Sequence, residues 1–185
     1  MKRTLFAFAL LLSLFALSAG LRSQPTPLEI TYLANEGFLL SAGGQQVLID
    51  ALFGEGLPDY EAVPPATREK LETAQPPFDQ VGLILVSHYH SDHFSSRALV
   101  RYLEHNPRAI LLSSPQVVDR VATRSPSLVA AAPNRFQRVE PKGYRRVPLT
   151  VAGIRLEVQY VTHGHRRASI QNLGHIIHLG GKKIL

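Results

Sequence analysis

Residues 81–93 have the sequence Val-Gly-Leu-Ile-Leu-Val-Ser-His-Tyr-His-Ser-Asp-His, and this stretch decides both the fold class and the chemistry. The apolar run Val81–Val86 is typical of a strand that is buried on both faces. Directly after it, His88 and His90 stand at positions i and i+2, which point the same way in an extended chain, so both imidazoles can reach one ion. The chain should then turn toward a helix at Phe94, which aims Asp92 and His93 at a neighbouring point.

The composition limits what chemistry these residues can perform. The chain of 185 residues has eight His and no Cys, which excludes disulfides, thiolate zinc sites, iron–sulfur clusters and cysteine nucleophiles. Imidazole and carboxylate ligands without sulfur suit Zn²⁺, with Mn²⁺ and Fe²⁺ as alternatives. The ligands divide between two centres, which favours open, catalytic coordination over a closed structural site. A serine hydrolase is the competing enzyme class, but the sequence contains no G-x-S-x-G element.

Around this stretch the pattern predicts a mixed α/β architecture with sheets inside and helices outside. From Ala51 to Pro77 regular patterns vanish, and such long loops are usually functional lids or contain short helices. Helices are expected from Ser95 or Ser96 to about His105 and from Pro115 to about Thr123. Strands are expected at 28–33, 38–42, 47–50, 81–86 and 109–112, followed by antiparallel strands at 136–140, 147–151 and 154–161.

One internal repeat is visible. Residues 37–48 and 174–185 share the pattern of an apolar strand, a Gly-Gly turn and the start of a returning strand. Either two hairpins share turn chemistry by chance, or the fold consists of two similar halves with a site between their sheet edges.

The segment His88-Tyr-His90-Ser-Asp92-His93 resembles the HxHxDH motif of the metallo-β-lactamase fold superfamily of metal-dependent hydrolases. The resemblance extends from about Leu28 to Leu185 and includes Thr31–Gly37, Leu48-Ile49-Asp50 and Asn172-Leu-Gly174. These details are most similar to the branch of ascorbate-phosphate lactonase-like and N-acyl-phosphatidylethanolamine phospholipase-like hydrolases. The resemblance implies a four-layer αββα sandwich, incomplete at its C-terminus. The similarity to this branch argues against the interpretation of the protein as an antibiotic β-lactamase.

The resemblance also implies residue roles. His88 and His90 bind a first metal together with a later His, which we assign to His163, with His165 as the alternative. Asp92 and His93 bind a second metal, and Asp92 acts in catalysis by positioning a water molecule or accepting its proton. Asp50 either orients a ligand His or caps the loop that follows it.

The remaining basic residues have simpler interpretations. His105 ends a helix, where it favours the carbonyl dipoles. His175 and His178 are separated by an odd spacing and should face opposite sides of their strand. Arg166-Arg167 indicates a solvated turn, the alternative being contact with an anionic substrate group.

The N-terminus has the pattern of a secretory signal peptide. Lys2 and Arg3 precede an apolar run that ends at Leu17, and Ser18-Ala19-Gly20 supplies small residues for cleavage. A single membrane anchor is the alternative, but the run is short for a span of roughly 20 residues. We therefore expect a signal peptide at 1–19, a linker at 20–27 and a hydrolase domain at 28–185, in an exported, periplasmic or secreted protein without a stable membrane anchor.

The sequence thus predicts a metal-dependent hydrolase, with zinc as the expected metal. A metal-activated water would attack an ester, lactone, phosphodiester or amide in a small-molecule substrate. Basic residues are scattered, so no nucleic-acid partner is expected, and the oligomeric state stays open. The resemblance also implies a bridging Asp and a last His beyond Leu185, without which this form should be inactive. The alternative is a non-catalytic or vestigial metal-binding protein.

Overall fold

The computed structural model describes residues 26–55, 57–164 and 169–185. The expected signal peptide and most of the expected linker lie outside these residues. In chain order, the elements are β1 (Glu29–Ala34), β2 (Gly37–Ala42), β3 (Gln45–Ile49), α2 (Pro65–Glu72), β4 (Val81–Val86), α3 (Ser96–His105), β5 (Ile110–Ser113), α4 (Pro115–Arg124), α5 (Pro126–Ala131), η1 (Pro133–Arg135), β6 (Phe136–Arg138), β7 (Val147–Val151), β8 (Ile154–Tyr160), β9 (Leu173–Leu179) and β10 (Lys182–Ile184). No helix among the described residues is long and apolar enough to cross a membrane.

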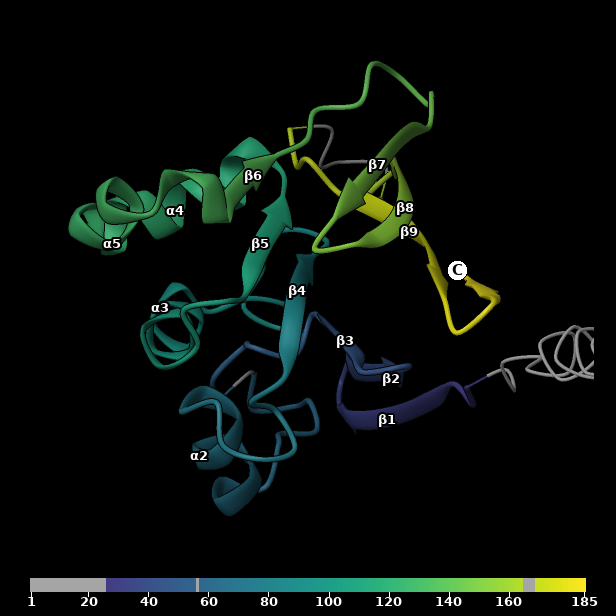
Figure 1. Ribbon diagram of the computed structural model, residues 1–185. Coiled ribbons are helices and arrows are strands. Elements are labelled where there is room, and N and C mark those ends of the chain that lie inside the picture. Colours follow the sequence, from purple (N-terminus) through teal and green to yellow (C-terminus); the bar gives the residue numbers. More distant parts are fainter. Residues whose placement is uncertain (1–25, 56, 165–168) are drawn as a thin grey trace, which may run out of the picture.

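The first sheet has six strands in the order β1-β2-β3-β4-β5-β6 (Figure 1). Strands β1, β2 and β3 pair antiparallel, whereas the pairs β3–β4, β4–β5 and β5–β6 are parallel. A helix lies in each of the parallel crossovers, as such connections usually require. The carboxyl ends of β3, β4 and β5 therefore meet at one edge of the sheet, where the candidate ligand residues that follow β4 lie.

The prediction of an antiparallel strand at 136–140 was wrong. Only Phe136–Arg138 forms a strand, and it pairs parallel to β5 at the edge of the first sheet. The cause is the helical connection through α4 and α5, which carries the chain back to the starting edge before β6 begins. Helix α5 itself was not predicted.

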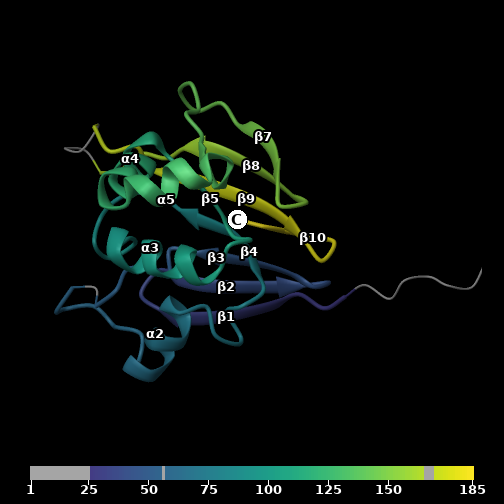
Figure 2. The ribbon, with the colours of Figure 1, turned by 60° about the vertical axis from the view of Figure 1, so that its left-hand side comes forward.

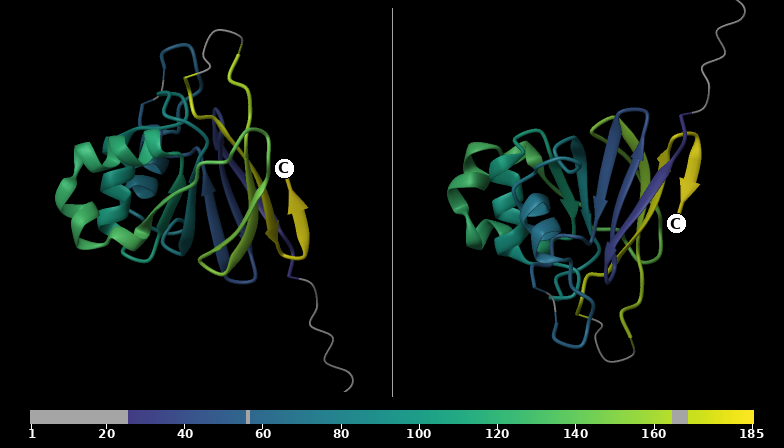
Figure 3. Two further views of the ribbon diagram at one scale, coloured as in Figure 1. Left: turned by 90° about the horizontal axis from the view of Figure 1, so that it is seen from above. Right: turned by 90° about the horizontal axis from the view of Figure 1, so that it is seen from below.

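The second sheet has four antiparallel strands in the order β10-β9-β8-β7. Figures 2 and 3 show it on one face of the six-stranded sheet and the helices on the other face. Alternating residues of β4 explain this arrangement, because Ile84 and Val86 join the core under the helices while Leu83 and Leu85 join the core between the sheets. The architecture is of the metallo-β-lactamase type, with three of the four expected layers present in the described residues.

Both copies of the internal repeat are hairpins, and they lie in different sheets. The turns Gly43-Gly44 and Gly180-Gly181 all have positive φ, between 57° and 76°. A Cβ on Gly180 would lie 2.8 Å from the Cβ of Ala42, so the two hairpin ends are in contact. The two similar hairpins therefore face each other across the interface between the sheets.

The long region 51–77 is partly helical. Helix α2 begins at Pro65, a residue that suits the first helical turn, and it buries Leu71 against the core of the helical face. The expectation that so long a connection contains a short helix is met.

Candidate metal centre

The loop Ser87–His93 leaves the carboxyl end of β4 and ends just before α3. The backbone amides of His93 and Phe94 both donate to the carbonyl oxygen of His90, at 3.0 and 2.8 Å. These bonds form the tight turn that was expected before the helix. The side-chain amide of Asn35, in the turn between β1 and β2, also donates to the backbone oxygen of Asp92. This bond ties the loop to that turn.

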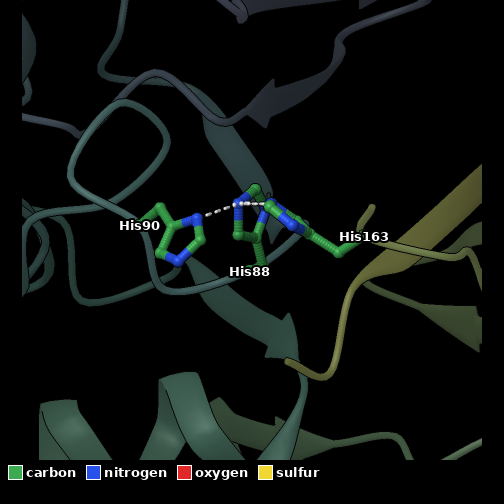
Figure 4. Close-up of side chains that lie close together, drawn as sticks. All are labelled: His88, His90 and His163. Carbon is green, nitrogen blue, oxygen red and sulfur yellow. Dashed lines mark hydrogen bonds between the residues drawn. The ribbon is translucent and has the colours of Figure 1, made fainter. Parts of the chain in front are cut away.

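A first group of candidate ligands consists of His88, His90 and His163. Nε2 of His88 lies 3.1 Å from Nδ1 of His90 and 2.9 Å from Nε2 of His163, which follows β8 in the second sheet. Figure 4 shows the His88 ring between the other two. The three residues present their nitrogens to a common point although His163 is 75 positions from His88 in the sequence.

A second group consists of His88, Asp92 and His93. One ligand atom from each lies within 4.8 Å of the others. Nε2 of His93 is 3.7 Å from the Asp92 carboxylate. His88 belongs to both groups, so the two candidate centres are adjacent, as the sequence pattern indicated.

The spacing of these nitrogens fits a small divalent ion. Ligands at the 2.0–2.1 Å typical of zinc–imidazole bonds stand about 3.3 Å apart in a tetrahedral site. The 2.9 and 3.1 Å separations in the first group need to widen by only a few tenths of an ångström. The donor set contains imidazole and carboxylate but no sulfur, which zinc accepts readily.

A buried carboxylate orients two of the candidate ligands. Asp50, which is 6% exposed, accepts hydrogen bonds from the amide of Ser87 at 2.7 Å, from its hydroxyl at 2.6 Å and from Nδ1 of His93 at 2.9 Å. Because the Ser87 hydroxyl donates to Asp50, it accepts from Nδ1 of His88 at 3.0 Å, which leaves Nε2 of His88 as the acceptor that a metal requires. Of the two roles considered for Asp50, the structure therefore favours orientation of ligands. Ser87 was not singled out from the sequence, where its position at a strand end gave no distinctive signal.

The electrostatics of the site differ between its histidines. Burial, together with the neighbouring His93, His163 and His90, lowers the pKa of His88 to about 4, so His88 is neutral at pH 7 and able to bind a cation. Burial also acts to lower the pKa of His93. The hydrogen bond and charge of Asp50 outweigh it, so the pKa of His93 is raised.

Three other histidines of the described residues, His105, His175 and His178, belong to neither group. His105 donates from Nδ1 to the carbonyl oxygen of Arg101 at 2.8 Å at the end of α3, in agreement with its structural interpretation. His178 contacts Glu157 and Arg155 on one face of β9, whereas His175 lies on the face toward Asp50, with its Nε2 buried and without a hydrogen-bond partner. His165 and the pair Arg166-Arg167 lie outside the described residues.

Two sheets covered by helices on one face, with a histidine-rich candidate site at the strand ends, are the architecture of the metallo-β-lactamase fold. The chain belongs to the family described as Beta-lactamase superfamily domain, whose model matches residues 45–185. No curated protein matches it in sequence.

Solved structures of metal-dependent hydrolases share this fold. Igni18, a metallo hydrolase from Ignicoccus hospitalis, is 17% identical with a TM-score of 0.55, over 85% of this chain and 58% of the other. A putative metal-dependent hydrolase from Parabacteroides distasonis is 14% identical with a TM-score of 0.52, over 85% of this chain and 59% of the other. A possible metal-dependent hydrolase from Veillonella parvula is 15% identical with a TM-score of 0.51, over 82% and 58%. The chain thus spans less than two thirds of the length of these structures.

Proposed function

We propose that this protein is a zinc-dependent hydrolase that cleaves a small ester, lactone, phosphodiester or amide. The observation that carries the proposal is the convergence of His163, from the second sheet, with His88 and His90, from the first. Three imidazoles that meet from distant segments, one of them neutral because of its burial, are characteristic of a metal site and serve no evident packing role.

Within this proposal each residue has a distinct task. His88, His90 and His163 hold the first ion, while Asp92 and His93 provide ligands for a second. A zinc ion held by these residues would lower the pKa of a coordinated water toward about 7 and would so supply hydroxide at neutral pH. The Asp92 carboxylate, whose side chain is 20% exposed, would orient that water or accept its proton. Asp50 and Ser87 keep the imidazoles of His93 and His88 in place.

A second candidate function is metal binding without turnover. It is favoured by the composition of the second group, in which Asp92 and His93 are the only ligands not shared with the first group among the residues that the structure describes. Two ligands hold an ion weakly, and weak occupancy of the second centre would limit hydrolysis.

One experiment separates the two functions. The metal-free protein is titrated with Zn²⁺ or Mn²⁺, the bound metal is counted by mass spectrometry, and hydrolysis is measured on p-nitrophenyl acetate, γ-butyrolactone and bis(p-nitrophenyl) phosphate. Metal-dependent turnover that is lost in His88→Ala supports the hydrolase. Stoichiometric zinc binding with no turnover on any substrate supports the non-catalytic alternative, and no zinc binding contradicts both.

We also propose that the protein is exported and that residues 1–19 are removed, on the basis of the Lys2-Arg3 pair and the apolar run that follows. N-terminal sequencing of protein recovered outside the cytoplasm should begin near Gly20. Cytosolic protein that retains Met1 would contradict this proposal.

A further inference from the structure

A cavity of about 530 Å³ lies beside the candidate metal centre, and His163 forms part of its wall. Much of the rest is aromatic or aliphatic, from Tyr144, Tyr160, Val161 and Ile170. Two of these side chains are unusually accessible for their type, since Tyr144 is 78% and Val161 42% exposed. Large apolar groups left in water beside a polar centre are typical of a ligand site.

The walls of this cavity are held in place by specific contacts. The side-chain oxygen of Gln171 accepts from the backbone amide of Gln116 at 3.1 Å. In return, the side-chain oxygen of Gln116 accepts from the backbone amide of Gln171 at 2.9 Å. This reciprocal pair anchors one wall to the first turn of α4. The backbone amide of Val161, another lining residue, donates to the carbonyl oxygen of Asn172 at 2.9 Å. The cavity is therefore a formed feature of the fold.

Close packing explains how Val161 reaches this position. A Cβ on Gly174 would lie 2.7 Å from Cγ2 of Val161, a distance that is too short for two carbon atoms. The absence of a side chain at Gly174 thus leaves the space that the Val161 side chain occupies.

The part of the cavity wall that the structure describes has few charged groups. None of the described residues that line it carries a formal charge at pH 7 apart from any proton on His163. Burial, with a contribution from Glu140, raises the pKa of Tyr160, so its phenol stays neutral. A ring or alkyl group would find apolar contacts with these described residues.

We infer that this cavity is the specificity site of the enzyme and binds an uncharged aromatic or branched alkyl group of the substrate. His163 belongs both to the cavity wall and to the first ligand group, so a bound group lies next to the scissile bond at the metal centre. The inference rests on the proposed function, and it narrows the substrate to one that carries an apolar substituent.

Binding can be tested without turnover, in the metal-free protein. The probes are 4-phenylbutan-2-one and 4-hydroxybutan-2-one, two uncharged ketones that differ in a phenyl group against a hydroxyl group. In an NMR titration we expect the phenyl ketone to shift the methyl signals of Val161 and Ile170 and to bind about tenfold more tightly than the hydroxy ketone. Equal affinity for both ketones, or shifts elsewhere only, would overturn the inference.

Substitutions at exposed positions of the wall provide the second test, because exposed side chains contribute little to the stability of the fold. Val161→Asp and Tyr144→Ser should each weaken binding of the phenyl ketone by about tenfold, since burial of a charge or loss of an aromatic ring removes the apolar contact. Tyr60→Ser is the matched control, because Tyr60 is 49% exposed and does not line the cavity. Unchanged binding in both wall variants would also overturn the inference.

Metal content keeps this test separate from that of the proposed function. If the wall variants lose ketone binding but keep zinc, both conclusions stand. If ketone binding is normal but the wild-type protein binds no zinc, the proposed function fails while the cavity remains a site for apolar ligands.

Discussion

The substitution Asp50→Asn should weaken metal binding at the second ligand group while the protein stays folded. Asp50 is 6% exposed and accepts from Ser87 and from Nδ1 of His93. Asparagine has the same shape, but when its oxygen keeps the bond from the backbone amide of Ser87, its NH2 group faces Nδ1 of His93 and cannot accept from it. The backbone at Asp50 has φ of 42°, a conformation that Asn and Asp adopt more readily than other non-glycine residues, so the substitution adds no backbone strain.

The expected magnitude follows from the contacts that are lost. Removing the partner that orients a ligand His typically reduces metal affinity by about 10- to 100-fold, which equals about 1.4–2.7 kcal/mol. The His93 bond joins a carboxylate to an imidazole at 2.9 Å, and a hydrogen bond to a charged group contributes about 1.5–3 kcal/mol to stability. Both the affinity for the second ion and the free energy of unfolding should therefore decrease by about 2 kcal/mol.

Calorimetric titration with Zn²⁺ and urea unfolding measure these two quantities. Asp119→Asn is the control, since Asp119 pairs with Arg138 at 2.7 Å, is 61% exposed and belongs to neither ligand group. Such a surface pair contributes about 0–1 kcal/mol, and metal affinity should not change. If Asp50→Asn lost stability but bound the second ion as tightly as the wild type, Asp50 would serve only the loop that follows it.

Two further predictions concern histidines. His163→Ala should sharply reduce bound metal, because it removes one of three converging imidazoles, whereas His105→Ala should not. Mass spectrometry of the purified variants measures the bound metal. If both variants kept their metal, our assignment of His163 would be contradicted. Burial lowers the pKa of His175 from 6.5 to about 4, so its contribution to stability is complete above pH 6.5 and is lost as the pH falls toward 4. This loss of unfolding free energy is up to about 3 kcal/mol. His175→Leu should therefore make the free energy of unfolding less dependent on pH between about pH 4 and 6.5. An unchanged slope of unfolding free energy against pH would refute this prediction.

Several elements of the fold were predictable because their sequence signals are strong. Val81–Val86 is apolar throughout, which is required of a strand between a helical layer and a second sheet. The paired glycines marked both hairpins because few other residues adopt positive φ at two successive positions. The direction of β6 was not predictable, since its three residues carry no periodicity and its partner is chosen by the crossover through α4 and α5.

The candidate site was predictable only as far as its residues are close in sequence. Four candidate ligands lie within six residues, and their types and spacing predict metal binding: His88, His90, Asp92 and His93. His163 was assigned through the resemblance to a family, because a separation of 75 positions leaves no local pattern. The side chain of Asn35 binds the backbone of Asp92. In the sequence, the turn alone is enough to explain an asparagine at this position, so the contact with Asp92 could not be predicted.

Ser87 shows why the tertiary structure completes this site. Its hydroxyl and amide bind Asp50 at the end of β3, while its carbonyl oxygen accepts from the amide of Leu173 at the start of β9, at 2.9 Å. One residue thus joins the ligand loop to a neighbouring strand of its own sheet and to the second sheet. Because β9 pairs with β8, after which His163 follows, this contact also fixes the position from which the third imidazole reaches His88. The geometry of the metal centre therefore depends on the docking of the two sheets, which no short segment of the sequence encodes.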